Sequence, residues 1–272
     1  SRVRFAAGIA IGKTKAIGHY SAVLDLLRKN NNHDLFLRHA GIYALERMVK
    51  NPQQVSALSS DPSPAVRLAA VVALRRMKSI EVARFVKDPD PKVQDEVIRA
   101  IQDLDMIDMR PLVAELLDDL GNRKWSDFML RRLIHNAYRL GTVENASRIL
   151  AVAANNTLPY EVREEALRLI ANWEKPFPAD QLSGHWRPLE ARPLDTLKPA
   201  LEKALPVLLK SDGFLLAGTL ALVDKYEINI ASLDDESLRL IVTKAELSGD
   251  ARAKALTLYI RRDGEGLNDL LA

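Results

Sequence analysis

Side chains that could carry chemistry are few in this chain and lie far apart. The chain has five histidines, which are His19, His33, His39, His135 and His185. A zinc site on one helix needs two histidines at i and i+4, a spacing that no pair of them has. None of them is followed by glutamate, so the paired His-Glu motif of a di-iron site is also missing. We therefore interpret the histidines as packing or surface residues.

Neighbouring carboxylates could act as general acid and base only if the fold brought them together in a cleft. Such pairs stand at Asp118-Asp119, Glu164-Glu165 and Asp234-Asp235. The chain has no cysteine, which excludes a thiol nucleophile and a cysteine-ligated metal, and it has neither a Gly-x-Ser-x-Gly elbow nor a Gly-rich phosphate loop. We therefore expect no enzyme activity and no cofactor in this chain. An enzyme or enzyme accessory with an acidic cleft formed in three dimensions stays open as an alternative.

An arginine recurs along the chain, each time directly after an apolar residue at the start of an apolar run. The recurrent residues are Arg4, Arg38, Arg67, Arg131, Arg163 and Arg252, with Gln94 in the corresponding place of one copy. Asp61 and Asp88 precede two of the copies. We expect a ladder of aspartate–arginine pairs between neighbouring copies, each contributing about 1 kcal/mol or less where exposed. A phosphate-binding role for the same arginines is the alternative.

The apolar runs that follow these arginines have the period of an α-helix. Apolar residues at i, i+3, i+4 and i+7 predict amphipathic helices, and no segment alternates with a period of two, so we expect an all-α protein. Asp61 and Asp88 are candidate N-caps, and the prolines after them suit a first helical turn. One apolar stripe consists of Val66, Ala69, Ala70, Ala73, Leu74 and Met77.

Copies of this pattern recur at intervals of roughly thirty residues, a period typical of an α-solenoid. We expect about seven or eight helix pairs in a right-handed superhelix, forming a single domain over residues 1–272. The first repeats would occupy residues 1–173 and the last two would occupy residues 194–272. Among the first helices of the pairs, those near 52–59 and 80–86 would be short.

A segment rich in proline and tryptophan, residues 174–193, interrupts the helical pattern before an expected helix at 194–209. We expect it to be an ordered loop, because its aromatic side chains need a place to pack. If Trp173 and Trp186 are buried, they hold the loop against the helices, which is the interpretation we favour. If they are exposed, they would be interface anchors. The candidate interaction residues are Trp173, His185, Trp186 and Arg187.

The charge of the chain makes no strong demand on a partner, since the net charge is +3. Residues 1–50 are locally basic, which we interpret as a solvated face, with a polyanion-binding stripe as the alternative. No apolar run approaches the roughly 20 residues of a membrane span. The chain begins inside a repeat, without an initiator methionine, so we expect a fragment of a longer polypeptide. The sequence does not identify its compartment.

The pattern Asp-Pro-x-Pro-x-Val-Arg-x-Ala-Ala at Asp61–Ala70 resembles the HEAT repeat, in which an aspartate and an arginine recur at fixed places in the turn and the second helix. The resemblance covers most of the chain, with Gln94 departing from it, and implies stacked helix pairs that hold a partner. HEAT-like DNA glycosylases bind DNA along their concave face. The residues that could imitate an aromatic–acid–base set of this kind are Trp125, Asp127 and Arg131 or Arg132.

A narrower resemblance concerns Phe36–Leu45, Ala171–Trp173 and Gly184–Pro188. These segments are similar to the HEAT region of large exported haem-binding dehydrogenase-like proteins of planctomycetes and verrucomicrobia. There a β-propeller precedes the HEAT region and a c-type cytochrome domain follows it. The similarity implies that this chain is the helical spacer of such a protein, and would place it in the periplasm or outside the cell.

These patterns together favour a non-catalytic scaffold, expected to be monomeric, that contacts a protein partner or flanking domains of its own polypeptide. The first alternative is a nucleic-acid-binding HEAT-like module, similar to the DNA glycosylases, that uses the basic amino-terminal end. It predicts an affinity that falls steeply with salt.

Overall fold

The computed structural model describes residues 2–194, 197–211, 213–228 and 233–262. Within these ranges all regular secondary structure is helical, which confirms the all-α prediction. The one pairing of extended backbone in them is an isolated antiparallel bridge between Ala179 and Trp186. The chain divides into two compact units, Ser1–Val113 and Ala114–Ala272.

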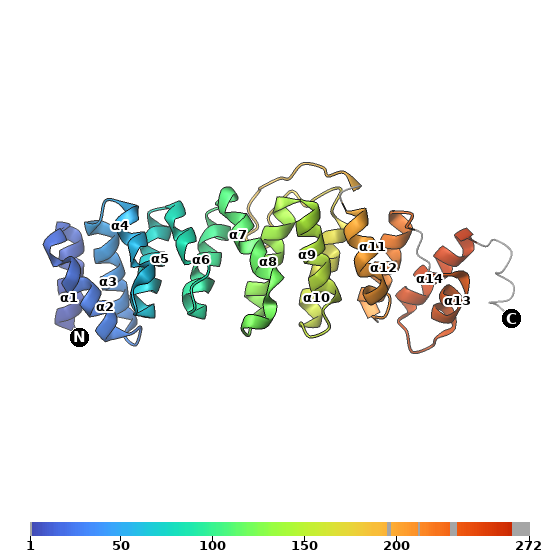
Figure 1. The fold of residues 1–272 in the computed structure, drawn as a ribbon, viewed down its shortest axis with the longest axis horizontal. Helices are drawn as coiled ribbons and strands as arrows, with labels where there is room; N and C mark the ends of the chain where they lie inside the picture. The colour runs from blue at the N-terminus through green and yellow to red at the C-terminus, as the bar shows by residue number, and fades with distance from the viewer. Residues whose placement is uncertain (1, 195–196, 212, 229–232, 263–272) are drawn as a thin grey trace. The chain divides into compact units, whose positions relative to one another are not determined.

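In the first unit, the longer helices pack side by side in the order of the chain (Figure 1). They are α1 (Arg2–Thr14), α3 (Leu35–Met48), α5 (Pro64–Arg76) and α6 (Pro91–Asp103). Between them in sequence lie α2 (Tyr20–Asn30), α4 (Pro52–Ser56) and the 3₁₀ helices η1 (Ile17–His19), η2 (Ala57–Ser60) and η3 (Ile80–Phe85). α2 contacts α3 and α5, α4 contacts α5, and η3 contacts α5 and α6. Thus α3, α5 and α6 each pack against at least one shorter element, and α2 and η3 each contact two neighbouring longer helices. The short helices expected near 52–59 and 80–86 are α4 with η2, and η3.

The second unit has the same kind of packing. Four short elements lead from α6 to α8: η4 (Ile107–Met109), α7 (Arg110–Ala114), η5 (Glu115–Asp118) and η6 (Leu120–Asn122). The longer helices of the second unit are α8 (Asp127–Leu140), α9 (Val143–Ala154), α10 (Tyr160–Ala171), α11 (Lys198–Leu208), α12 (Gly213–Lys225), α13 (Asp235–Thr243) and α14 (Gly249–Arg262). α8, α10, α12 and α14 contact one another in that order, while α9 contacts α11 and α13 contacts α14. Residues 195–196 of the helix expected at 194–209 lie outside the described residues.

The turns before α5 and α6 differ from the sequence prediction by two residues. The N-caps are Ser63 and Asp90, not Asp61 and Asp88, and a proline occupies the first turn of each helix. Asp61 and Asp88 instead accept a hydrogen bond from the backbone N–H of Ser63 and of Asp90, each at 2.9 Å. They therefore shape the turn that leads into the cap.

Small apolar residues allow the helices of the first unit to approach closely. The stripe predicted on α5 is buried at Val66, Ala69, Ala70, Ala73 and Leu74. Burying one leucine side chain stabilises a fold by about 1.5–3 kcal/mol, so the buried apolar residues of α3, α5 and α6 supply the main driving force for the association of these helices.

Candidate functional site

The recurrent arginine of α5 forms a buried ion pair. Arg67 Nε lies 2.7 Å from Asp88 Oδ2, and its Nη2 lies 3.0 Å from Asp88 Oδ1. Arg67 Nη1 also donates to the backbone carbonyl of Asp61 at 2.8 Å. The side chains of Arg67 and Asp88 are 9% and 3% exposed. Hydrogen bonding to Asp88, opposed by desolvation, raises the pKa of the Arg67 guanidinium. This pair has the arrangement expected of a ladder.

At other copies the recurrent residue donates to a backbone carbonyl at the end of the preceding helix. Gln94 Nε2 donates to Val86 at 2.9 Å. Arg163 Nε donates to a carbonyl of α9 at 3.0 Å, and Arg252 Nε to a carbonyl of α13 at 2.8 Å. The last carbonyls of a helix lack intrahelical donors, so this position satisfies them. Gln94 makes the same contact as the arginines, while the aspartate partners expected for Arg163 and Arg252 are replaced by carbonyls.

The arginine of α8 contacts a buried glutamate instead of a turn aspartate. Arg131 Nε donates to Glu165 of α10, and His135 Nε2 lies 2.5 Å from the other oxygen of that carboxylate. Burial favours the protonated acid, but the hydrogen bonds from His135 and Arg131 outweigh it and hold the pKa of Glu165 below its usual range. These contacts tie α8 to α10, so Glu165 serves packing.

Arg38 departs from the ladder. Asp61, its expected partner, is held by Arg28 of α2, whose Nη2 lies 2.6 Å from Asp61 Oδ2. Among the residues that the structure describes, the Arg38 guanidinium has no hydrogen-bond or ion-pair partner. It lines a groove on the first unit.

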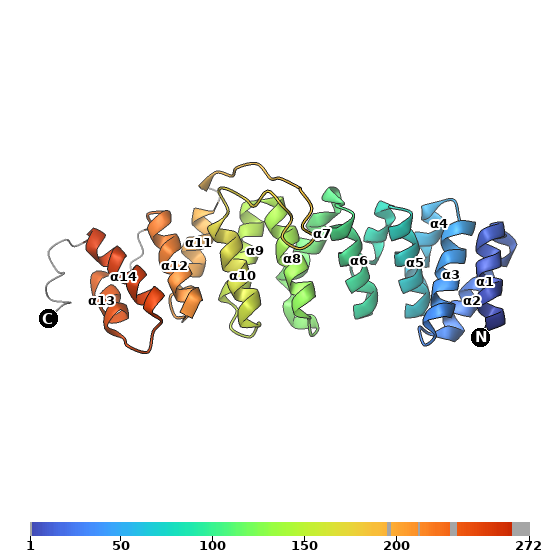
Figure 2. The ribbon, with the colours of Figure 1, turned by 180° about the vertical axis from the view of Figure 1, so that it is seen from behind.

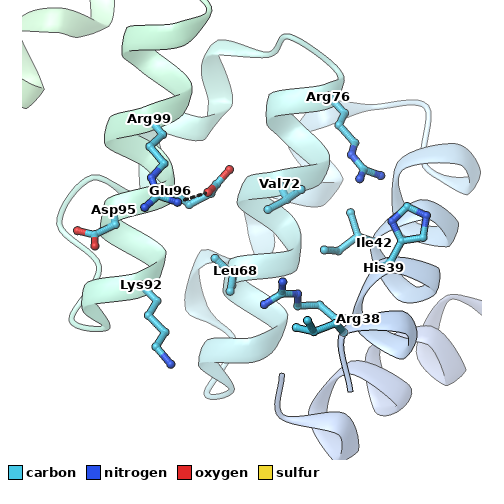
Figure 3. Close-up of a pocket in the computed structure, with 11 residues that line it drawn as sticks. Arg38, His39, Ile42, Leu68, Val72, Arg76, Lys92, Asp95, Glu96 and Arg99 are labelled. Carbon is cyan, nitrogen blue, oxygen red and sulfur yellow. Dashed lines mark ion pairs between the residues drawn. The ribbon is translucent and has the colours of Figure 1, made fainter. Parts of the chain in front are cut away.

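This groove lies over α3, α5 and α6 and has a volume of about 370 Å³ (Figure 3). Its apolar part consists of Leu35, Ile42, Leu68 and Val72, and its polar part of Arg38, His39, Arg76, Lys92, Asp95, Glu96 and Arg99. In Figure 3, Arg38 and Lys92 lie at one end with Leu68 between them, and Arg76 and Arg99 lie at the other. Arginine and lysine thus outnumber the acids along an apolar floor.

The loop 174–193 is held over the carboxyl end of α8 (Figure 2). Trp173, directly before it, is fully buried and packs edge-on against Tyr138 at 6.0 Å between ring centroids. The Arg192 guanidinium, at the far end of the loop, lies 4.6 Å from the Trp173 ring and 4.7 Å from the Tyr138 ring. Desolvation in this position lowers the pKa of Arg192. Trp173 is therefore a packing residue, as the favoured interpretation expects, and its buried ring is not open to a partner.

A buried aspartate fixes the middle of the loop. Asp180 Oδ1 accepts from the backbone N–H groups of Leu182 and Ser183, each at 3.0 Å. Arg187 Nη1 lies 3.5 Å from Asp180 Oδ2, and Arg139 Nη2 of α8 donates to the carbonyl of Arg187 at 3.0 Å. Burial disfavours ionisation of Asp180, but these backbone N–H groups and Arg139 hold its pKa below the usual range. Arg187 thus turns inward to hold the loop.

Trp186 differs from Trp173, because 73% of it is exposed. The favoured expectation that both tryptophans are buried is therefore wrong for Trp186. His185 beside it is also exposed, while its carbonyl accepts from the backbone N–H of Asp180 at 2.9 Å. An anchored loop thus presents a large aromatic side chain to solvent.

The aromatic–acid–base set considered for nucleic acid is not assembled. Trp125 is buried, and the Arg123 guanidinium covers its ring at 3.7 Å. Asp127 is exposed at the start of α8, while Arg131 is engaged by Glu165. The Trp125 face is therefore not open for a base to stack on.

Neither a metal cluster nor a membrane span is found in the part of the chain that the structure describes. There, no three His, Cys, Asp or Glu side chains gather as a metal ion would require. No helix described has both the length and the apolar character needed to cross a bilayer.

Sequence reasoning missed most of the groove residues. Arg38 entered only as a ladder residue, and Lys92, Arg76 and Arg99 were not singled out. The available signal was the placing of basic residues near the starts and ends of consecutive helices, which becomes a site only once the helices are packed.

Comparison of the chain with protein-family models, curated proteins and solved structures found no match.

Proposed function

We propose that this chain is a non-catalytic protein-interaction module in which an anchored loop presents Trp186 to a protein partner. The exposure of Trp186 on a loop fixed at both ends carries the proposal. Tryptophan is enriched among the residues that dominate binding energy. A loop whose backbone is already held in place loses little conformational entropy on binding. Asp180 and Arg192 supply that order here.

The proposal includes the architecture, an α-solenoid of about seven or eight HEAT-like helix pairs in a right-handed superhelix. Two observations support it. Within each unit the longer helices contact their neighbours in chain order. A side chain at matching places in α5, α6, α10 and α14 donates to the end of the preceding element. A repeated local contact of this kind is what a repeat protein needs between its units.

The observations weigh against the nucleic-acid alternative in the second unit. The Trp125 ring is covered by Arg123, whereas binding of single strands or flipped bases uses open aromatic faces.

The test places a photo-crosslinking benzoylphenylalanine at position 186 in the source cells, and at position 128 as the control. Phe128 is 71% exposed and lies on α8, outside the loop, so it matches Trp186 in exposure. We expect one protein to be crosslinked from position 186 and not from position 128. With that protein purified, Trp186→Ala should weaken binding about 30-fold, the loss typical of a hot-spot residue. Phe128→Ala should leave the affinity unchanged.

Neither alanine variant should alter thermal stability beyond about 0.5 kcal/mol, because both side chains are exposed. Equal affinities of wild type and Trp186→Ala for the crosslinked protein would show that the loop does not bind it, and the proposal would be abandoned.

The resemblance to the HEAT region of exported haem-binding dehydrogenase-like proteins adds a second part to the proposal, in which this chain is the helical spacer of a larger exported redox protein. Its test is the intact mass and the reduced absorption spectrum of the polypeptide captured from its source. A much longer chain with a c-type haem band is expected. A chain of this length without haem would refute the spacer role and leave the interaction module standing.

A further inference from the structure

The groove on the first unit contains cations that the fold does not use. Arg38 and Lys92 have no hydrogen-bond or ion-pair partner for their side-chain charges among the described residues. The basic residues at the other end differ in this respect: Arg76 lies 3.3 Å from Glu46, and Arg99 lies 3.7 Å from Glu96. Two unpaired cations therefore face the same end of one groove.

Helix stability does not account for these charges. Lys92 follows Pro91 in the first turn of α6, and Arg38 lies in the first turn of α3. A positive charge near a helix N-terminus is unfavourable, because the macrodipole is positive there. Both side chains thus add to the positive potential of the groove at some cost to their own helices.

An apolar surface lies between the cations. Ile42, Leu68 and Val72 line the groove, and Leu68 lies between Arg38 and Lys92 in Figure 3. A ligand that fits this surface needs carboxylates near the two cations and an apolar side chain between them.

We propose that the groove over α3, α5 and α6 binds an acidic peptide segment with interspersed apolar side chains, belonging to a protein partner. This inference rests on the proposed function, since it supplies a second contact for a protein partner, but it uses residues remote in sequence from the Trp186 loop. Carboxylates of the segment pair with Arg38 and Lys92, and a leucine or similar side chain covers Leu68.

The groove fits a peptide better than a nucleic acid. Asp95 and Glu96 line it as well, and they would repel a continuous phosphate backbone, whereas a peptide can place a neutral residue beside them. The apolar floor gains nothing from phosphates or sugars but is stabilised by an aliphatic side chain.

The experiment measures the fluorescence anisotropy of a labelled synthetic peptide in which glutamates alternate with leucines, titrated with the full chain. A peptide with glutamine in place of glutamate tests the carboxylates, and a labelled DNA duplex tests the nucleic-acid rival. Arg38→Gln and Lys92→Gln each remove one cation. Lys87→Gln is the matched control, because Lys87 is an exposed lysine of the same unit that lies outside the groove and has no side-chain partner among the described residues.

We expect the glutamate peptide to bind, the glutamine peptide to bind at least tenfold more weakly, and each groove variant to lose about tenfold, or about 1.4 kcal/mol. Lys87→Gln should lose less than twofold. Equal binding of both peptides, equal losses for Lys92→Gln and Lys87→Gln, or tighter binding of the DNA would each overturn the inference. We expect Trp186→Ala to leave peptide binding unchanged. Peptide binding therefore tests the groove alone, while binding of the crosslinked protein tests the loop, so either proposal can fail without the other.

Discussion

The buried pair between Arg67 and Asp88 offers a sharp test of the packing described above, through the variant Asp88→Asn. Both carboxylate oxygens of Asp88 accept from Arg67, and one of them also accepts from the backbone N–H of Asp90. The amide keeps one acceptor oxygen but turns an NH₂ group toward the guanidinium. The substitution therefore leaves a buried cation without its counter-charge.

Removing one partner of a buried ion pair costs about 3–5 kcal/mol. Since the asparagine retains one acceptor, we expect the lower end, about 3 kcal/mol. At about 2 °C or more per kcal/mol for a chain of this size, the melting temperature should fall by about 6 °C or more. Differential scanning calorimetry measures the shift, and circular dichroism confirms that the variant is folded at the start.

The matched control is Asp118→Asn. Asp118 binds Arg148 with the same bidentate geometry, both distances being 2.8 Å, but its side chain is 57% exposed. Solvent screens an exposed pair, so we expect a loss of no more than about 1 kcal/mol. If the two variants shift the melting temperature equally, burial is not what gives the Arg67 pair its strength, and the reasoning is refuted.

Further predictions follow from single contacts. Gln94→Ala leaves the carbonyl of Val86, the residue directly after η3, without its donor. The loss should lower the free energy of unfolding in urea by about 1–3 kcal/mol, and no measurable loss would mean that water replaces the amide. The pKa of Glu165 is lower in the folded state than its value near 4.5 in the unfolded chain, so the ionised carboxylate stabilises the fold above that pH and this contribution is lost as the pH falls through the folded pKa. The difference in free energy of unfolding between wild type and Glu165→Gln should therefore shrink on acidification below about pH 4.5. A difference that grows on acidification contradicts this role of Glu165. Gly141→Ala should lower the free energy of unfolding by more than about 1 kcal/mol, because φ is +69° and a Cβ would meet Arg192 Nε at 2.6 Å. A Cβ on Gly18 has nothing within 4 Å, so Gly18→Ala serves as the control, and equal shifts in melting temperature for the two variants would contradict the prediction.

The sequence by itself determined the secondary structure, because helix formation depends on local spacing. The stripe from Val66 to Leu74 predicts α5 directly, since apolar residues at i, i+3 and i+4 share one helix face. The prolines in the first turns of α5 and α6 mark helix starts, because proline lacks the N–H that a first turn does not need. The capping residues were displaced by two positions, since Asp61 and Ser63 are both competent caps and the turn geometry decides between them.

The tertiary structure decided what each recurrent side chain contacts. Arg67 reaches Asp88, 21 residues away, and Arg131 reaches Glu165, 34 residues away. Such pairs depend on how neighbouring helices are rotated against one another, which local spacing does not specify. Asp61, the aspartate expected to pair with Arg38, is instead bound by Arg28 of α2.

The same reason separates the two tryptophans and creates the groove. Trp173 directly precedes the loop and Trp186 lies within it, but only Trp173 has Tyr138 and Arg192 to pack against. The groove cations come from α3, α5 and α6, so they converge only when these helices stack. Local sequence thus determined which helices form, while the contacts between distant segments determined which side chains are left free to bind a partner.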